Sequence, residues 1–204
     1  MHDTSKDFNT VLKAPDQPAE KVQETLVPYT DFDTYMRDSA DTFVVPTKQP
    51  FVNAMGLLYC ECKLAGETAE LIVAVREGDS DEVRAEAGDV LWYISQIARL
   101  LSLSPILPVV EPKPDRISSL PELAGFVAEN LGKLCRDYAP GTPKWALRMD
   151  CVALGLNGML ESLGYLLMGH GTGTAREEVL RAMTENRRKL LKRQIAGALH
   201  AHDR

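Results

Sequence analysis

Hydrophobic residues recur at helical spacing along most of this chain, and no stretch shows the sustained alternation of apolar and polar positions that is typical of a strand. The amphipathic segments are separated by breaks rich in proline and glycine. This pattern predicts an all-α protein built as a helical bundle. The expected helices start near residue 30 and then cover about 51–76, 80–102, 120–138, 145–168 and 174–199.

The ends of these helices carry recognisable signals. Asp31 or Thr30 is expected to cap the first helix, Ser80 the third and Thr174 the last. Residues 140–143 (Pro-Gly-Thr-Pro) are expected to form a turn. Residues 169–174 (Gly-His-Gly-Thr-Gly-Thr) predict a flexible break, and no strand precedes them as a phosphate-binding loop would require.

Prolines divide the chain into four parts. Residues 1–28 are expected to form a flexible N-terminal arm, and residues 29–104 a first helical unit that carries the catalytic groups. Residues 105–119, with four prolines, predict a stiff linker. Residues 120–204 form the second helical unit and end in a closing helix.

The two units share a short sequence echo. Residues 64–70 (Leu-Ala-Gly-Glu-Thr-Ala-Glu) match residues 123–129 (Leu-Ala-Gly-Phe-Val-Ala-Glu) at five of seven positions. Phe126 stands where the first unit has Glu67, and no carboxylates occur around Ala153 and Leu156. The echo predicts a tandem duplication with a degenerate second copy, so that one chain forms a pseudo-dimer with one working site.

Two acidic pairs supply the candidate chemistry. Glu67 and Glu70, and then Glu86 and Asp89, each have i, i+3 spacing, which places both carboxylates of a pair on one helix face. A short polar turn between them predicts an antiparallel helix pair in which the two acidic faces meet. Four converging carboxylates repel one another unless a cation lies among them. Oxygen ligands suit Mg²⁺, with Mn²⁺ as the alternative, and such a site implies a phosphate substrate.

A solvated acidic surface is the competing interpretation of these pairs. Acidic residues at helical spacing most often face water. Here, however, apolar residues flank both pairs, for example 71–73 after Glu70 and 90–92 after Asp89. Carboxylates at the edge of a core are costly unless they are paired or bind metal, which favours the metal site.

These residues resemble a known family. Residues 64–71 (Leu-Ala-Gly-Glu-Thr-Ala-Glu-Leu) with 86–93 (Glu-Ala-Gly-Asp-Val-Leu-Trp-Tyr) are similar to the ExxE…ExxD signature of the MazG-like all-α nucleoside triphosphate pyrophosphohydrolases. Residues 186–193 (Asn-Arg-Arg-Lys-Leu-Leu-Lys-Arg) resemble that family's closing helix. The intervening stretch departs from a minimal single-copy member.

The resemblance implies a Mg²⁺-dependent hydrolase that converts a nucleoside triphosphate to the monophosphate and pyrophosphate through metal-activated water. Glu67, Glu70, Glu86 and Asp89 would hold the metal, and Glu67 or Glu70 would act as general base. Lys189 and Arg193 would balance charge on the outer phosphates. Asn186 would bind sugar or phosphate, and Tyr93, one turn after Asp89, would pack on sugar or base. Base preference would depend on residues of the first helices, such as Gln49, Asn53 and Tyr59.

Composition agrees with an ordinary globular enzyme, since 45% of the 204 residues are hydrophobic and 25% are charged. The net charge of −6 argues against general nucleic-acid binding through a basic surface. No apolar run of about 20 residues predicts a membrane span, and the N-terminus lacks a signal pattern, so a cytoplasmic location is expected. The four cysteines predict buried free thiols.

Two functions from different classes remain open at this point. The first is the pyrophosphohydrolase, whose partner is a nucleoside triphosphate and which is compatible with a homo-oligomer. The second is a non-catalytic helical interaction or regulatory protein that retains the fold. The four acids of the first unit favour the enzyme, whereas their loss from the second unit leaves room for the regulator.

Overall fold

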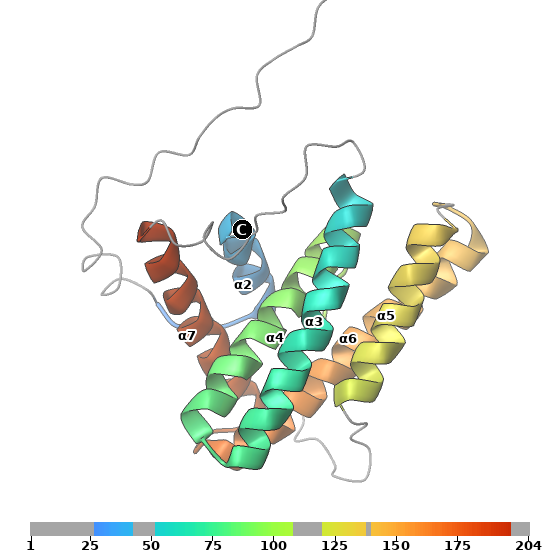
Figure 1. Ribbon diagram of the computed structural model, residues 1–204. Coiled ribbons are helices and arrows are strands. Elements are labelled where there is room, and N and C mark those ends of the chain that lie inside the picture. The colour runs from blue at the N-terminus through green and yellow to red at the C-terminus, as the bar shows by residue number, and fades with distance from the viewer. Residues whose placement is uncertain (1–26, 43–51, 108–119, 138–139, 197–204) are drawn as a thin grey trace, which may run out of the picture.

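The computed structural model describes residues 27–42, 52–107, 120–137 and 140–196 (Figure 1). Over these ranges the chain is helical and contains no strand, which confirms the predicted all-α class. The elements are α2 (Phe32–Ser39), the short 3-10 helix η1 (Ala40–Thr42), α3 (Val52–Glu77), α4 (Ser80–Leu101), α5 (Leu120–Arg136), α6 (Pro143–His170) and α7 (Ala175–Ile195).

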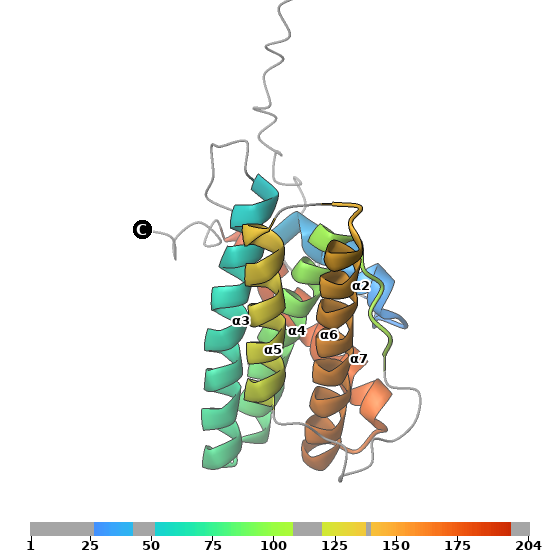
Figure 2. The ribbon, with the colours of Figure 1, turned by 90° about the vertical axis from the view of Figure 1, so that its right-hand side faces the viewer.

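Two helix pairs form the bundle. The α3–α4 pair and the α5–α6 pair lie side by side, with α3 packed on α5 and α4 packed on α6 (Figures 1 and 2). On the other side of α4, α7 packs against both α4 and α6, and α2 packs against α4 and α7. The central helix α4 is therefore covered on most of its circumference.

One hydrophobic core runs through both units. Leu71, Leu91 and Ile94 from the first unit belong to the same cluster of buried side chains as Leu131 and Leu156 from the second. The arrangement places like helices of the two units against each other, as a pseudo-dimer would. The tandem origin and the domain boundaries stay predictions, and most of the expected arm and linker lies outside the described residues.

Asp79, and not Ser80, caps α4. The Asp79 carboxylate accepts hydrogen bonds from the backbone N–H groups of Asp81 and Glu82, at 3.0 and 3.1 Å. Ser80 is instead the first helical residue of α4. α3 ends at Glu77, and Gly78 follows it with a left-handed φ of 75°. The expected caps at Asp31 and Thr174 are confirmed, and Thr174 forms a reciprocal capping box with Glu177.

α6 begins earlier than expected, at Pro143 rather than near Trp145. The Thr142 hydroxyl caps the helix by accepting from the Trp145 N–H at 3.2 Å. Proline fits the first helical position because its missing N–H would have no partner there in any case. The 140–143 segment is thus a turn only up to Thr142.

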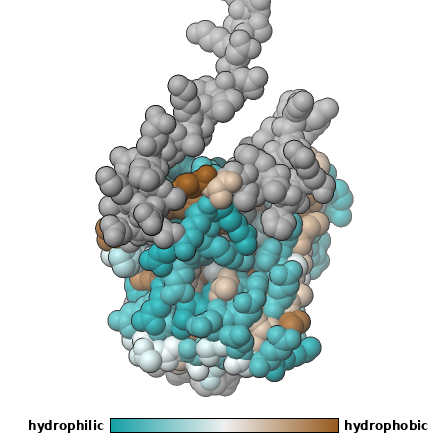
Figure 3. Space-filling view, turned by 60° about the vertical axis from the view of Figure 1, so that its left-hand side comes forward, coloured by the Kyte–Doolittle hydropathy of each residue, from teal (hydrophilic) through white to brown (hydrophobic). Residues whose placement is uncertain are grey.

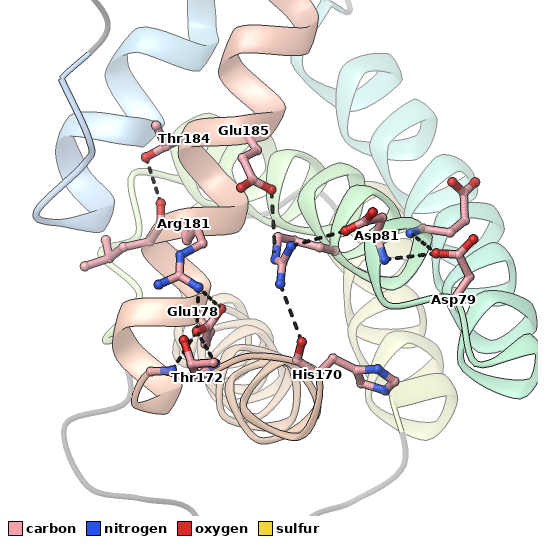
Figure 4. Close-up of polar contacts among 12 residues, drawn as sticks. Asp79, Asp81, His170, Thr172, Glu178, Arg181, Thr184 and Glu185 are labelled. Carbon is pink, nitrogen blue, oxygen red and sulfur yellow. Dashed lines mark hydrogen bonds and ion pairs between the residues drawn. The ribbon is translucent and has the colours of Figure 1, made fainter.

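The glycine-rich corner between α6 and α7 is held by a buried carboxylate rather than being a flexible break (Figure 4). Glu178 is 0% exposed, and its Oε1 accepts from the Thr172 and Gly173 N–H groups at 3.1 and 2.8 Å. Arg181 neutralises the same carboxylate. A Cβ atom on Gly171 would collide with Glu178, so glycine lets the corner close around this side chain.

α7 is an amphipathic cover for α4 and α6. Val179, Ala182 and Met183 are fully buried, whereas Arg176, Lys192 and Arg193 are exposed. The surface that comes forward when the α7 side is turned toward the viewer is mainly hydrophilic (Figure 3). The described residues visible in this view show no broad apolar area.

Among the described helices, α6 alone is long and apolar enough, by length and composition, to cross a membrane. α6 departs from the expectation that no segment of this length and hydrophobicity occurs. Half of the most apolar window is buried inside the structure, as in a core helix of a bundle, so α6 is weak evidence for a membrane span.

The four cysteines are free, as expected. The expectation that they are buried holds fully for Cys60 alone, where burial raises the pKa of the thiol to about 12. Cys62 is exposed, and Cys135 and Cys151 are partly buried.

The contact between α4 and α7 depends on Gly88. A Cβ atom at this position would lie 2.9 Å from the Asn186 Cβ and 3.2 Å from the Ala182 carbonyl oxygen. Neither atom is the free end of a flexible side chain, so α7 could not approach α4 as closely with a larger residue at position 88.

We expect Gly88→Ala to destabilise the protein by about 1–3 kcal/mol through overpacking, despite the higher helix propensity of alanine. Gly125→Ala is the matched control, because Gly125 lies inside α5 with no atom within 4 Å of an added Cβ. The control should stabilise by roughly 0.5–1 kcal/mol. Urea denaturation of both variants tests this, and equal shifts would contradict the close approach.

Candidate functional site

Three carboxylates from α3 and α4 meet at one point. Glu67 and Glu70 lie on neighbouring positions of one face of α3, and Glu86 projects from the second turn of α4. The tight α3–α4 turn places these segments opposite each other. One oxygen from each of Glu67, Glu70 and Glu86 lies within 4.8 Å of the other two. The expected convergence of the acidic faces is therefore present for these three residues.

Two carboxylates of the cluster, Glu67 and Glu86, have raised pKa values. Burial, followed by the charges of Asp89, Glu70 and Glu67, raises the pKa of Glu86 to about 7. Burial and the charges of Asp89 and Glu70 also raise the pKa of Glu67. These carboxylates hold protons more tightly than usual because each negative charge is poorly solvated and faces others.

One carboxylate oxygen of the cluster has no hydrogen-bond donor. The Glu86 Oε2 is buried and has no hydrogen-bond partner among the described residues. A buried carboxylate oxygen without a partner is costly, and a bound cation would satisfy it. Three carboxylates form a hard, oxygen-only donor set, which fits Mg²⁺ or Mn²⁺ and does not fit a thiolate-preferring metal.

Asp89 lies beside the three glutamates but is bonded to α7. Its Oδ1 accepts a hydrogen bond from the Asn186 side-chain amide at 2.6 Å, and its Oδ2 pairs with the Lys189 ammonium. Its charge raises the pKa of both Glu67 and Glu86, so it is electrostatically part of the cluster. A direct role as fourth metal ligand stays a prediction.

The closing helix delivers Asn186 and Lys189 to the acidic site. These residues are 97 and 100 positions from Asp89 in the sequence, and the fold brings both onto its carboxylate. Their roles toward a substrate stay predictions. Arg193, one turn further along α7, is exposed.

The role of Tyr93 toward sugar or base stays a prediction. Tyr93 is 9% exposed, and its ring packs edge-on against Tyr59 and Trp92 with centroid distances of 6.4 and 4.7 Å. Burial and the nearby Tyr59 and Glu67 raise its pKa. Tyr93 thus belongs to an aromatic cluster with Tyr59 and Trp92. Gln49 lies outside the described residues, and the side chain of Asn53 is not described.

Sequence reasoning missed Tyr35 of α2. Its hydroxyl donates to the Asn186 side-chain oxygen at 3.2 Å, so α2 also reaches the site. Phe32 and Tyr35 share one face of this helix at i, i+3 spacing, but no local pattern indicates the partner of the Tyr35 hydroxyl.

An open pocket of about 330 Å³ lies beside the cluster, between α3 and α4. Its rim contains Glu70 and Glu86 from the cluster and the apolar surface of Val73 and Ala74. The acidic cluster is therefore accessible to a small-molecule ligand rather than sealed inside the bundle.

The second unit has apolar packing where the first has acids. Phe126 lies against Gly155, with its ring carbon 3.2 Å from the position of an added Cβ, and Leu156 is fully buried. Glu129 forms an ion pair with Lys133 of its own helix. Phe126 is 36% exposed, so its side chain is only partly buried. The described part of this unit contains no candidate metal cluster.

Comparison with known proteins agrees with this geometry. Residues 60–104 match the family model of the MazG nucleotide pyrophosphohydrolase domain. The chain is similar to this family over those residues. The match includes all four acids and Tyr93, and it confirms the resemblance seen in the sequence; α7 lies outside it.

One relative is the Gene 37 protein of Mycobacterium phage L5. It is 29% identical over an alignment of 82 residues, which covers 35% of this chain and 72% of that protein. No solved structure matches the chain.

The raised pKa of Glu86 predicts a pH-dependent stability in the absence of divalent metal. Between the unfolded carboxyl pKa near 4.5 and the folded pKa of about 7, the folded state holds a proton that the unfolded state has released. Stability must therefore fall as pH rises through this window. We expect the melting temperature of the wild type in EDTA to fall more steeply from pH 5 to pH 8 than that of Glu86→Gln.

Glu82→Gln is the matched control, because Glu82 is an exposed acid of the same helix. Its melting profile should follow the wild type. Mg²⁺ added at pH 8 should raise the wild-type midpoint more than the Glu86→Gln midpoint, through binding linkage. Parallel pH profiles for wild type and Glu86→Gln would contradict the electrostatic account.

Proposed function

We propose that this protein is a divalent-cation-dependent nucleoside triphosphate pyrophosphohydrolase that releases a nucleoside monophosphate and pyrophosphate. The observation that carries the proposal is the meeting of Glu67, Glu70 and Glu86 at one accessible point within a MazG-like segment. Next to these glutamates lies the Asp89 carboxylate, which is bonded to the Asn186 amide and to the positively charged Lys189.

The residues fit Mg²⁺, or Mn²⁺ in its place. Glu67, Glu70 and Glu86 would hold the ion, and Asp89 would contribute as a ligand or as a neighbouring charge. When bound, the cation supplies positive charge that neutralises the triphosphate and lowers the pKa of a water molecule. The buried, unpartnered Glu86 Oε2 supports this assignment.

The protein's own groups would move the proton and orient the substrate. Glu67 and Glu70 are both candidates for the general base. Lys189 would balance charge on the outer phosphates, and Asn186 would donate or accept at sugar or phosphate. Attack at the α-phosphorus would break its bond to the bridging oxygen and release pyrophosphate.

The second unit would serve as a structural partner with no site of its own. Phe126 and Gly155 pack together at the positions where acids would be needed, and Glu129 is neutralised by Lys133. Its contribution to chemistry would come from α7, which supplies Asn186 and Lys189 to the first unit's acids. One chain would then contain one active site, in a cytoplasmic enzyme.

A non-catalytic regulatory protein with the same fold is the competing function. The 29% identical phage protein has a name that states no activity, and therefore does not decide between the two. Retention of the acids together with an open pocket at their edge favours the enzyme.

We expect Glu70→Gln to lower the hydrolysis rate by about a hundredfold or more, because it removes a charged group at the centre of the cluster. Asp89→Asn should have a similar effect, since it also loses its pairing with Lys189. Glu129→Gln is the control and should keep nearly full turnover, because Glu129 is paired on the surface of α5. Pyrophosphate release is the assay, after circular dichroism has confirmed folding.

Full activity in both Glu70→Gln and Asp89→Asn would show that the cluster is not the catalytic site. Loss of activity in Glu129→Gln equal to that in Glu70→Gln would instead show that the second unit holds working chemistry. Absence of turnover in the wild type with every common nucleoside triphosphate and deoxynucleoside triphosphate would support the regulatory alternative.

The products should be monophosphate and pyrophosphate in equal amounts. Anion-exchange chromatography of a reaction with Mg²⁺ and a triphosphate measures both. If the reaction runs in water enriched in oxygen-18, the label should enter the monophosphate, because water attacks the α-phosphorus. Diphosphate and orthophosphate as first products would show attack at the terminal phosphorus and would contradict the proposed mechanism.

A further inference from the structure

We propose that Tyr35 is a positioning residue that orients Asp89 for metal binding by fixing the side-chain amide of Asn186. The inference rests on the proposed function, because it assigns Asp89 to the metal-binding cluster. It adds α2, a helix outside the matched 60–104 segment, to the parts that build the site.

A chain of two hydrogen bonds joins three helices. The Tyr35 hydroxyl of α2 donates to the Asn186 Oδ1 of α7 at 3.2 Å, and the Asn186 Nδ2 donates to the Asp89 Oδ1 of α4 at 2.6 Å. Both contacts join residues that are far apart in sequence. Their geometry is therefore set by how α2 and α7 pack on α4.

The donors and acceptors allow one orientation of the amide. An ionised Asp89 carboxylate can only accept, so the NH₂ group of Asn186 must face it. The amide oxygen then faces Tyr35, whose hydroxyl must be the donor. Burial and the charge of Asp89 raise the pKa of Tyr35, so that the hydroxyl keeps its proton.

The surroundings leave little freedom for this chain. Tyr35 is 0% exposed and Asn186 is 3% exposed, so water does not compete freely for either group. The Tyr35 ring packs edge-on against Tyr29 and Phe32, with centroid distances of 5.2 and 6.1 Å. On its other side, Asn186 is seated against Gly88, the residue before Asp89.

Without the Tyr35 hydroxyl, the amide oxygen would lose its buried donor and the amide could turn. Asp89 would then lose the fixed N–H that sets the direction of its Oδ1. Mutation of a residue that orients a metal-binding carboxylate typically lowers metal affinity or activity by about 10–100-fold. A purely structural role for Tyr35 would not produce this change in metal affinity, because the phenylalanine ring in Tyr35→Phe fills the same space.

Tyr35→Phe tests the inference, and Tyr29→Phe is its matched control. The Tyr29 hydroxyl belongs to the same aromatic cluster, but it donates to Asp38 at 3.1 Å instead of to Asn186. Mn²⁺ binding to the full-length protein, measured by calorimetry and by electron paramagnetic resonance, is the readout. Tyr35→Phe should raise the dissociation constant for Mn²⁺ about tenfold or more, while Tyr29→Phe should stay within about twofold of the wild type.

A double-mutant cycle tests whether Tyr35 acts through Asn186. In an Asn186→Ala background, adding Tyr35→Phe should produce no further loss of Mn²⁺ affinity, because the intermediary is already absent. A full additional tenfold loss would overturn the proposed route. If Asn186→Ala fails to fold, the comparison of Tyr35→Phe with Tyr29→Phe decides the inference by itself.

The outcomes separate this inference from the proposed function. Wild-type Mn²⁺ affinity in Tyr35→Phe, even with a lowered melting temperature, would overturn the positioning role and leave the hydrolase intact. Mn²⁺ binding that depends on Tyr35 in a protein that hydrolyses no nucleotide would support the positioning role and overturn the hydrolase. Absence of Mn²⁺ binding in the wild type would overturn both.

Discussion

Glu67, Glu70 and Glu86 carry like charges, and the bundle must supply the free energy that holds their oxygens within 4.8 Å of one another. Part of this energy is visible in the raised pKa values of Glu67 and Glu86. Such repulsion persists in a protein when the surrounding packing is strong enough to fix the backbone. Here the packing comes from α4, whose segment from Val90 to Ala98 is buried on all sides. A cation bound among these carboxylates would offset this repulsion, which supports the proposed metal site.

The closing helix α7 balances this arrangement. Lys189 brings a positive charge to Asp89, and Asn186 brings an N–H donor. Neither contact would form if α7 lay farther from α4, and Gly88 is what permits the close approach. The network continues to α2 through Tyr35, so elements from both ends of the described chain converge on one aspartate. A site built in this way is sensitive to helix packing as well as to its own charged groups.

The asymmetry of the two units follows from the same electrostatics. A second set of facing carboxylates would impose the same repulsion without a closing helix to offset it. The second unit instead places Phe126 on Gly155 and buries Leu156, contacts that stabilise without any cation. Because α3 packs on α5 and α4 on α6, these apolar contacts support the acidic unit directly. This arrangement would result from a duplicated helix pair in which one copy retained the acidic residues and the other retained only apolar contacts.

The sequence by itself determined the helices, the two acidic pairs and the link to the MazG-like family, because these depend on local periodicity and spacing. Helical spacing placed Glu67 and Glu70 on one face whatever the tertiary fold. It also marked Thr174 as a cap, since a cap involves neighbouring residues only. The tertiary structure alone decided that Asp89 is bonded to Asn186 and Lys189, that Tyr93 is buried, and that Tyr35 reaches the site. It also decided that the glycine-rich corner closes around Glu178. These contacts join residues on different helices, and their distances depend on how closely whole helices pack, which no local pattern in the sequence specifies.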